Sequence, residues 1–199
     1  MRQVYYHTYA SHHAYQLGWS AMYDGQHSVA AAAAATIVET TSANMLRKFA
    51  EHEEARQALE WYVGVRFGKW DDLLAKPMPS DPELRAVTTA TAHWARAIAL
   101  GALGRFREAS AEAEQFERRR AELPPRRINV VPSARTLEVG AAMLSGELAY
   151  RAGDTTAAFD HLRRAVALED ALPYDEPAGW LTPVRSARRA RGAILSCEF

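Results

Sequence analysis

Apolar and small residues recur along this chain at helical spacing, and one pattern of them returns four times. In each copy a small or aromatic residue stands seven positions before a glycine, and alanine or leucine follows that glycine by five positions. The copies are Gly18–Gly25–Ala30, Trp61–Gly68–Leu73, Ala97–Gly104–Ala109 and Gly146–Gly153–Ala158. Small residues let two helices approach closely, and glycine permits a tight reversal between them. Each copy therefore predicts an antiparallel helix pair.

A helix–turn–helix unit repeated in this way is the tetratricopeptide (TPR) pattern. We predict an all-α fold, a single domain over residues 1–199, in which TPR-type antiparallel helix pairs stack in a right-handed α-solenoid. The predicted units cover residues 4–40, 53–76, 82–123 and 132–171, and a final helix covers 178–195. Ser42 is a candidate N-cap for a short helix over 43–50, and Pro82 suits the first position of a helix. No segment shows the alternation of a strand.

The composition of the chain argues against several classes of function. Basic and acidic residues number 24 each, so the formal net charge is zero, and nothing indicates a nucleic-acid or membrane-binding surface. A single cysteine, Cys197, excludes a disulfide framework and a cysteine-type zinc site. The first residues do not resemble a signal peptide, and no apolar stretch reaches the length of a membrane span. We expect a cytoplasmic protein without a cofactor.

Several short stretches resemble a group of bacterial TPR proteins that are mostly uncharacterised and form longer chains. The similar stretches are Ser11-His12 with Met22 and Gly25, residues 65–71, residues 92–96, and residues 167–177 with Trp180, Pro183, Val184 and Arg185. The resemblance spans about residues 10–185 and implies the fold, but no activity. This chain has Ser11-His12-His13 where the group often has Pro-His-Asn, and it becomes arginine-rich after Arg185, where the group continues into further repeats.

In TPR arrays the first helices line a concave groove. The register set by the turn glycines predicts that the groove-facing residues are His12, Tyr15, Trp19, Met22, Tyr62, Val65, Arg66, Trp94, Ile98, Met143, Glu147, Tyr150, Trp180 and Arg185. Most are aromatic or apolar. Glu147 stands among apolar residues and needs a partner, for which Arg66 is the obvious candidate.

The leading hypothesis is an interaction module that binds a protein or peptide partner in this groove, with the aromatic residues in contact and Arg66 and Glu147 fixing orientation. For any single aromatic residue the alternative is a place in the core, and an Arg66–Glu147 pair could equally be a structural strut.

A competing hypothesis is a small-molecule or metal-dependent enzyme within the groove, using His12, His93, Glu147 and Glu176. Spacing along the sequence does not support a metal site, because His12 and His13 point about 100° apart on a helix. Phosphate-binding loops, nucleophile elbows and zinc-protease helices are missing from the sequence. A third possibility is a homodimer formed through the C-terminal helix.

Overall fold

The computed structural model describes residues 2–187, which form nine α-helices, one 3-10 helix and a two-stranded hairpin. A further helical turn starts at Val184. The elements are α1 (Arg2–Tyr23), α2 (His27–Thr40), α3 (Ala43–Glu53), η1 (Glu54–Ala58), α4 (Leu59–Arg66), α5 (Trp70–Ala75), α6 (Ala86–Ala102), α7 (Phe106–Ala121), β1 (Arg127–Ile128), β2 (Val131–Pro132), α8 (Ser133–Arg151) and α9 (Thr155–Asp170).

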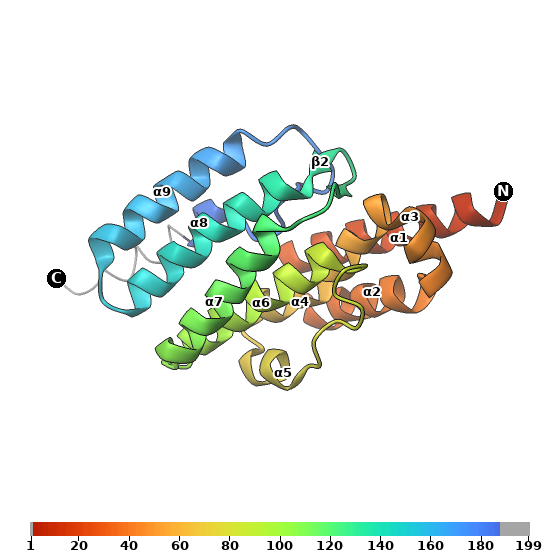
Figure 1. The fold of residues 1–199 in the computed structure, drawn as a ribbon. Helices are drawn as coiled ribbons and strands as arrows, with labels where there is room; N and C mark the ends of the chain where they lie inside the picture. Colours follow the sequence, from red (N-terminus) through yellow and green to blue (C-terminus); the bar gives the residue numbers. More distant parts are fainter. Residues whose placement is uncertain (1, 188–199) are drawn as a thin grey trace.

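The helices pack in antiparallel pairs, as the repeated pattern predicts: α1 with α2, the short α4 with α5, α6 with α7, and α8 with α9 (Figure 1). The chain reverses within each pair at the predicted glycine, and all four glycines have a positive φ, between +64° and +87°. Only glycine adopts this backbone conformation without strain.

The close-approach positions of the pattern are confirmed as well. Gly18, Trp61, Ala97 and Gly146 on the first helices are buried, and so are Ala30, Leu73, Ala109 and Ala158 on the second helices. A Cβ atom added to Gly146 would lie 2.8 Å from Leu162 Cγ and 3.2 Å from the carbonyl oxygen of Ala158. Close packing in the α8–α9 pair therefore depends on the missing side chain at Gly146.

The first helix of the unit predicted over residues 53–76 is interrupted. α3 extends to Glu53, Glu54–Ala58 form the 3-10 helix, and α4 begins only at Leu59. All five residues of η1 are buried, charged ones included. This segment places Glu54 and Arg56 inside the protein, next to the buried Glu53 at the end of α3.

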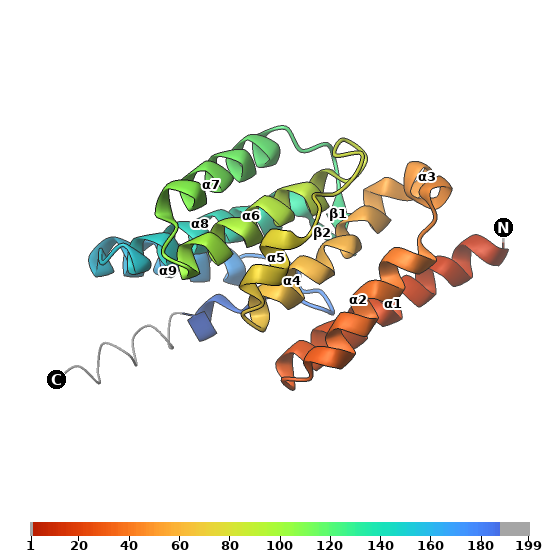
Figure 2. The ribbon, with the colours of Figure 1, turned by 90° about the horizontal axis from the view of Figure 1, so that it is seen from below.

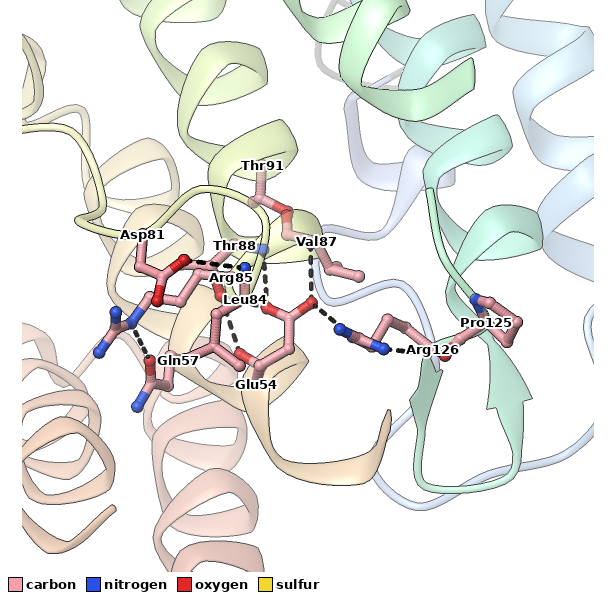
Figure 3. A network of polar contacts seen from close by, with 10 residues as sticks. All are labelled: Glu54, Gln57, Asp81, Leu84, Arg85, Val87, Thr88, Thr91, Pro125 and Arg126. Atoms are coloured by element: carbon pink, nitrogen blue, oxygen red, sulfur yellow. Dashed lines mark hydrogen bonds and ion pairs between the residues drawn. The ribbon is translucent and has the colours of Figure 1, made fainter. Parts of the chain in front are cut away.

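The first helix of the third pair begins later than the start predicted at Pro82. Residues 81–85 form a turn, and α6 starts at Ala86 without a side-chain cap of its own. Glu54 supplies that cap from another element: its carboxylate accepts hydrogen bonds from the backbone N–H groups of Val87 (2.8 Å) and Thr88 (3.2 Å) (Figure 3). The start of α6 is therefore fixed by a contact distant in sequence, which local capping patterns do not predict.

Two further predictions are wrong. The chain does contain strands, because Arg127–Ile128 pairs antiparallel with Val131–Pro132 in a short hairpin. The final helix does not begin at residue 178: residues 178–183 are non-helical, and helical structure starts at Val184. Residues 188–195 of that predicted helix lie outside the described residues.

The segment that follows α9 crosses the face formed by α4, α6 and α8 (Figure 2). Trp180, Leu181 and Val184 are at most 1% exposed. The Trp180 ring lies 5.3 Å from the ring of Tyr62 on α4 and 5.1 Å from the ring of Trp94 on α6, measured between centroids. This aromatic cluster is part of the core and joins the second, third and fourth helix pairs.

Candidate functional site

A pocket of about 260 Å³ opens on the face of α4, α6 and α8, and the segment after α9 completes its wall. Five lining residues stand at positions predicted to face a groove. They are Val65, Arg66, Ile98, Met143 and Glu147. The remaining lining residues are Trp70, Arg151, Thr182, Pro183, Ser186 and Ala187. The pocket therefore includes positions from three of the predicted first helices, and we name this site the α4–α6–α8 pocket.

The charged residues of this pocket are arranged differently from the prediction. Within the described residues, Glu147 forms an ion pair with Arg151, one turn further along α8. Oε2 of Glu147 lies 3.9 Å from Nε of Arg151. The guanidinium of Arg66 donates from Nε to the carbonyl oxygen of Met22 at 3.0 Å, which links the ends of α4 and α1. The predicted Arg66–Glu147 pair is thus replaced by two separate contacts, although both side chains line the same pocket.

Most of the predicted aromatic contact residues are not on this surface. Tyr15, Tyr62, Trp94 and Trp180 are at most 1% exposed, so for these four the core interpretation holds. Trp19 and Tyr150 are half-buried, and the Trp19 ring packs against Tyr23 at 4.8 Å. The aromatic surface of the pocket comes instead from Trp70, which begins α5 two residues after the turn glycine Gly68. Trp70 lies on the second helix of its pair and is therefore not among the first-helix positions predicted to face a groove.

His12 lies outside the pocket, in a separate polar cluster between α1, η1 and the hairpin. Burial lowers the pKa of His12, and the nearby charge of Arg56 lowers it further, against a hydrogen bond with Asn129 that raises it. Arg56 donates to Glu53 Oε1 (3.0 Å), to the carbonyl oxygen of Thr8 (3.4 Å) and to Asn129 Oδ1 (3.1 Å).

The cluster continues to the loop after α9. Asn129, which has a positive φ, donates from Nδ2 to Asp175 Oδ1 at 3.3 Å, and Asp175 also accepts from the backbone N–H groups of Val130 and Glu176. The sequence pattern does not indicate Arg56, Asn129 and Asp175 as a group. Their positions are far apart in the chain, and the only local signal was the polar content of residues 53–57.

The four residues of the metal-dependent alternative are not brought together. His93 Nδ1 lies 2.6 Å from Glu112 Oε2 between α6 and α7, while Glu147 is in the pocket. His12 is in the polar cluster, and the exposed Glu176 accepts a hydrogen bond from Tyr174. Within residues 2–187, no group of three or more histidine, cysteine, aspartate or glutamate side chains is arranged to hold a metal ion.

Comparison of the chain with protein-family models, with curated proteins and with solved structures finds no significant match. In the described part of the chain, no helix has the length and apolar character needed to cross a membrane.

Proposed function

We propose that this chain is an interaction module that binds a peptide segment in the α4–α6–α8 pocket. In this proposal the helix pairs are TPR-type units of a right-handed α-solenoid, as in the bacterial group that the sequence resembles. The proposal rests on one observation above all: residues from three successive first helices, at the positions expected to face a groove, line a common pocket. A surface assembled from repeated positions is typical of repeat proteins that bind extended segments.

The chemistry of the lining indicates the kind of peptide. Val65, Trp70, Ile98 and Met143 offer apolar contact, and the described lining also contains two arginines, Arg66 and Arg151, and one carboxylate, that of Glu147. An apolar side chain next to a carboxylate, from an acidic residue or a chain terminus, complements this surface. The guanidinium of Arg66 is exposed and suited to bidentate contact with such a carboxylate.

The test is selection from a displayed library of random peptides on the immobilised wild-type protein, followed by affinity measurements. We expect enriched peptides to combine an apolar residue with an acidic one. Trp70→Ala and Arg66→Met should each weaken their binding by about tenfold, the scale of one lost anchor or charge-assisted contact. Arg107→Met, on the exposed surface of α7, is the matched control and should bind as the wild type does. Equal binding by all three variants, or a selection without a shared motif, contradicts the proposal.

The enzyme hypothesis has no comparable observation in its favour. It needs His12, His93, Glu147 and Glu176 around one substrate, and these side chains lie in three different environments and on an exposed loop. The homodimer through the C-terminal helix stays a prediction, since most of that helix lies outside the described residues.

A further inference from the structure

The first helix pair carries almost no charge. Among residues 3–38, Asp24 is the only acidic or basic residue, apart from four histidines that are counted as neutral. The second helix of the third pair, α7, has charged residues at positions 107, 108, 112, 114 and 117–120. A helix face in contact with water usually carries charged and polar residues. The surface of the first pair is therefore better suited to contact with protein than with water.

An apolar groove of about 370 Å³ lies between α1 and α2. Ala14 and Leu17 line it from α1, and Val29, Ala32 and Ala33 line it from α2. None of the described lining residues is charged. The alanine run of residues 30–35 leaves the groove open, because Ala32 and Ala33 have no atoms beyond Cβ that could fill it. We call this surface the α1–α2 face.

The α1–α2 face is turned away from the rest of the protein. The pair packs on α4 through its other side, where a Cβ atom added to Gly18 would lie 2.5 Å from Leu59 Cδ2. Figure 2 shows α1 and α2 at one edge of the molecule, with α4 on their inner side. Leu17 is 53% exposed, and Tyr6, about three turns earlier on the same side of α1, is 67% exposed. Exposed apolar surface of this kind is typical of an interaction site.

The shape of this face is complementary to itself. Leu17 stands eight residues before Gly25 and Ala33 stands eight residues after it, so the two lie opposite each other across the groove. A two-fold axis that runs between α1 and α2, parallel to both, would place the Leu17 side chain of each copy over Ala32 and Ala33 of the other. In this arrangement α1 of one copy packs antiparallel on α2 of the other, and a large side chain fills the gap left by small ones.

The charge and the area of the α1–α2 face also fit a second copy of this chain. No acidic or basic side chain of the described residues lines the groove, so neither copy would remove an ionised group from water there. α1 has 22 residues and α2 has 14. At a rise of about 1.5 Å per residue and a width of about 10 Å per helix, their common face covers about 500 Å². Two such faces bury about 1,000 Å², the lower limit for a specific protein interface.

We propose that the α1–α2 face is the interface of a homodimer, in which two copies of the first helix pair form a four-helix layer. This interface shares no lining residue with the α4–α6–α8 pocket and does not depend on peptide binding there. It also differs from a dimer formed through the C-terminal helix, since α1 and α2 are the first two helices of the chain. Because the buried area is small, we expect a reversible dimer whose population depends on concentration.

The test is sedimentation equilibrium of the full chain at concentrations up to about 1 mM, where even a dimer with a millimolar dissociation constant is populated. We expect the wild type to approach twice the mass of one chain as the concentration rises. Ala32→Glu puts a carboxylate of each copy into the uncharged interface and should raise the dissociation constant by about a hundredfold or more. Leu17→Ala removes the side chain that fills the groove and should raise it by about tenfold.

Ala35→Glu is the matched control, because Ala35 belongs to the same helix but lies outside the groove, and this variant should dimerise as the wild type does. Ala32 and Ala35 are both exposed in the single chain, so neither substitution should disturb folding, which circular dichroism checks. Sodium chloride between about 50 mM and 500 mM should not weaken the dimer, because no ion pair holds the interface together. A single-chain mass at every concentration, or a dimer that Ala32→Glu and Leu17→Ala leave unchanged, would overturn the proposal. The second outcome would mean that the copies meet at another surface, such as the C-terminal helix.

Discussion

The indole nitrogen of Trp94 donates a hydrogen bond to the carbonyl oxygen of Gly140 at 3.1 Å, and so ties α6 to α8 within the core. The same glycine provides the space for a second indole. A Cβ atom at position 140 would lie 2.6 Å from Cη2 and 2.9 Å from Cζ3 of Trp180. Gly140 therefore positions both Trp94 and the segment that carries Trp180, which forms one wall of the α4–α6–α8 pocket.

We expect Gly140→Ala to lower the free energy of unfolding by about 1–3 kcal/mol, the usual cost of overpacking a core. The added methyl group meets a rigid ring whose other contacts, to Tyr62 and Trp94, restrict its movement. Urea denaturation at neutral pH measures the effect.

Gly101→Ala is the control for this substitution. Its Cβ would also be crowded, at 2.7 Å from Leu148 Cδ2, but that atom is the end of a flexible side chain. Alanine also favours a helix over glycine by about 1 kcal/mol. Gly101→Ala should therefore cost clearly less than Gly140→Ala, and the reverse order would show that Trp180 can shift freely.

The helix pairs were predictable because their determinants are local. A small residue, a turn glycine and a second small residue stand at fixed spacing, and Gly153, for example, adopts the positive φ that its turn requires. The irregular segments were not predictable in the same way. α6 begins at Ala86 because Glu54, more than thirty residues earlier, accepts its first N–H groups. No residue near Pro82 in the sequence indicates that contact with Glu54.

For the candidate site, some of the positions predicted to face a groove line the pocket, and others lie in the core. Val65, Ile98 and Met143 line the pocket as expected, whereas Tyr62 and Trp94 are covered by Trp180. The segment that carries Trp180 was expected to be a further first helix, but residues 178–183 are non-helical, and Trp180 packs into the face itself. Helical periodicity indicates the face of a helix on which a residue lies. It does not indicate whether another segment of the chain covers that face.

Glu54 is expected to be the strongest single polar contributor to the start of α6. Glu54→Ala should reduce the free energy of unfolding by about 3 kcal/mol, since it leaves the N–H groups of Val87 and Thr88 without their buried acceptor, while the Thr88 hydroxyl keeps the carbonyl oxygen of residue 54 as its acceptor (Figure 3). Glu54→Gln keeps one acceptor oxygen and should lose less. Glu114→Ala, exposed on α7, is the control and should be nearly neutral in urea denaturation.

Burial raises the pKa of Glu54 above its ordinary value of 4.5, in spite of the hydrogen bonds from Val87 and Thr88 that lower it. A carboxyl group with a raised pKa in the folded state contributes its full stability below its unfolded pKa and loses it as the pH rises through the folded pKa. Between about pH 4 and pH 7, the wild type should therefore lose stability relative to Glu54→Gln. A difference that stays constant over this range would mean that burial does not penalise the charged form.

Glu112 should show the opposite pH dependence. Burial alone would raise its pKa, but hydrogen bonds from His93 and Arg96 outweigh burial and leave the pKa lower than the ordinary 4.5. The stability from this group is present above the unfolded pKa and is lost as the pH falls through the folded pKa. The advantage of the wild type over Glu112→Gln should therefore shrink from about pH 5 to pH 3. Urea denaturation at several pH values measures it, and an advantage that grows toward acid would contradict the assignment.

The Glu53–Arg56 ion pair is almost completely buried, with Arg56 Nη1 3.0 Å from Glu53 Oε1. Each of the two residues should therefore stabilise the folded state mainly through its contact with the other. We expect Arg56→Met to cost about 3–5 kcal/mol, because it leaves a buried carboxylate without its countercharge. The double variant Glu53→Gln/Arg56→Met removes both charges and should cost less than the sum of the two single variants. A double-mutant cycle by urea denaturation gives the coupling energy directly. The cycle Arg105→Met with Glu108→Gln, an exposed pair at the N-terminal end of α7, is the control and should show little coupling. Additive costs at Glu53 and Arg56 would mean that the two side chains are stabilised separately by Asn129 and the surrounding backbone, and not by each other.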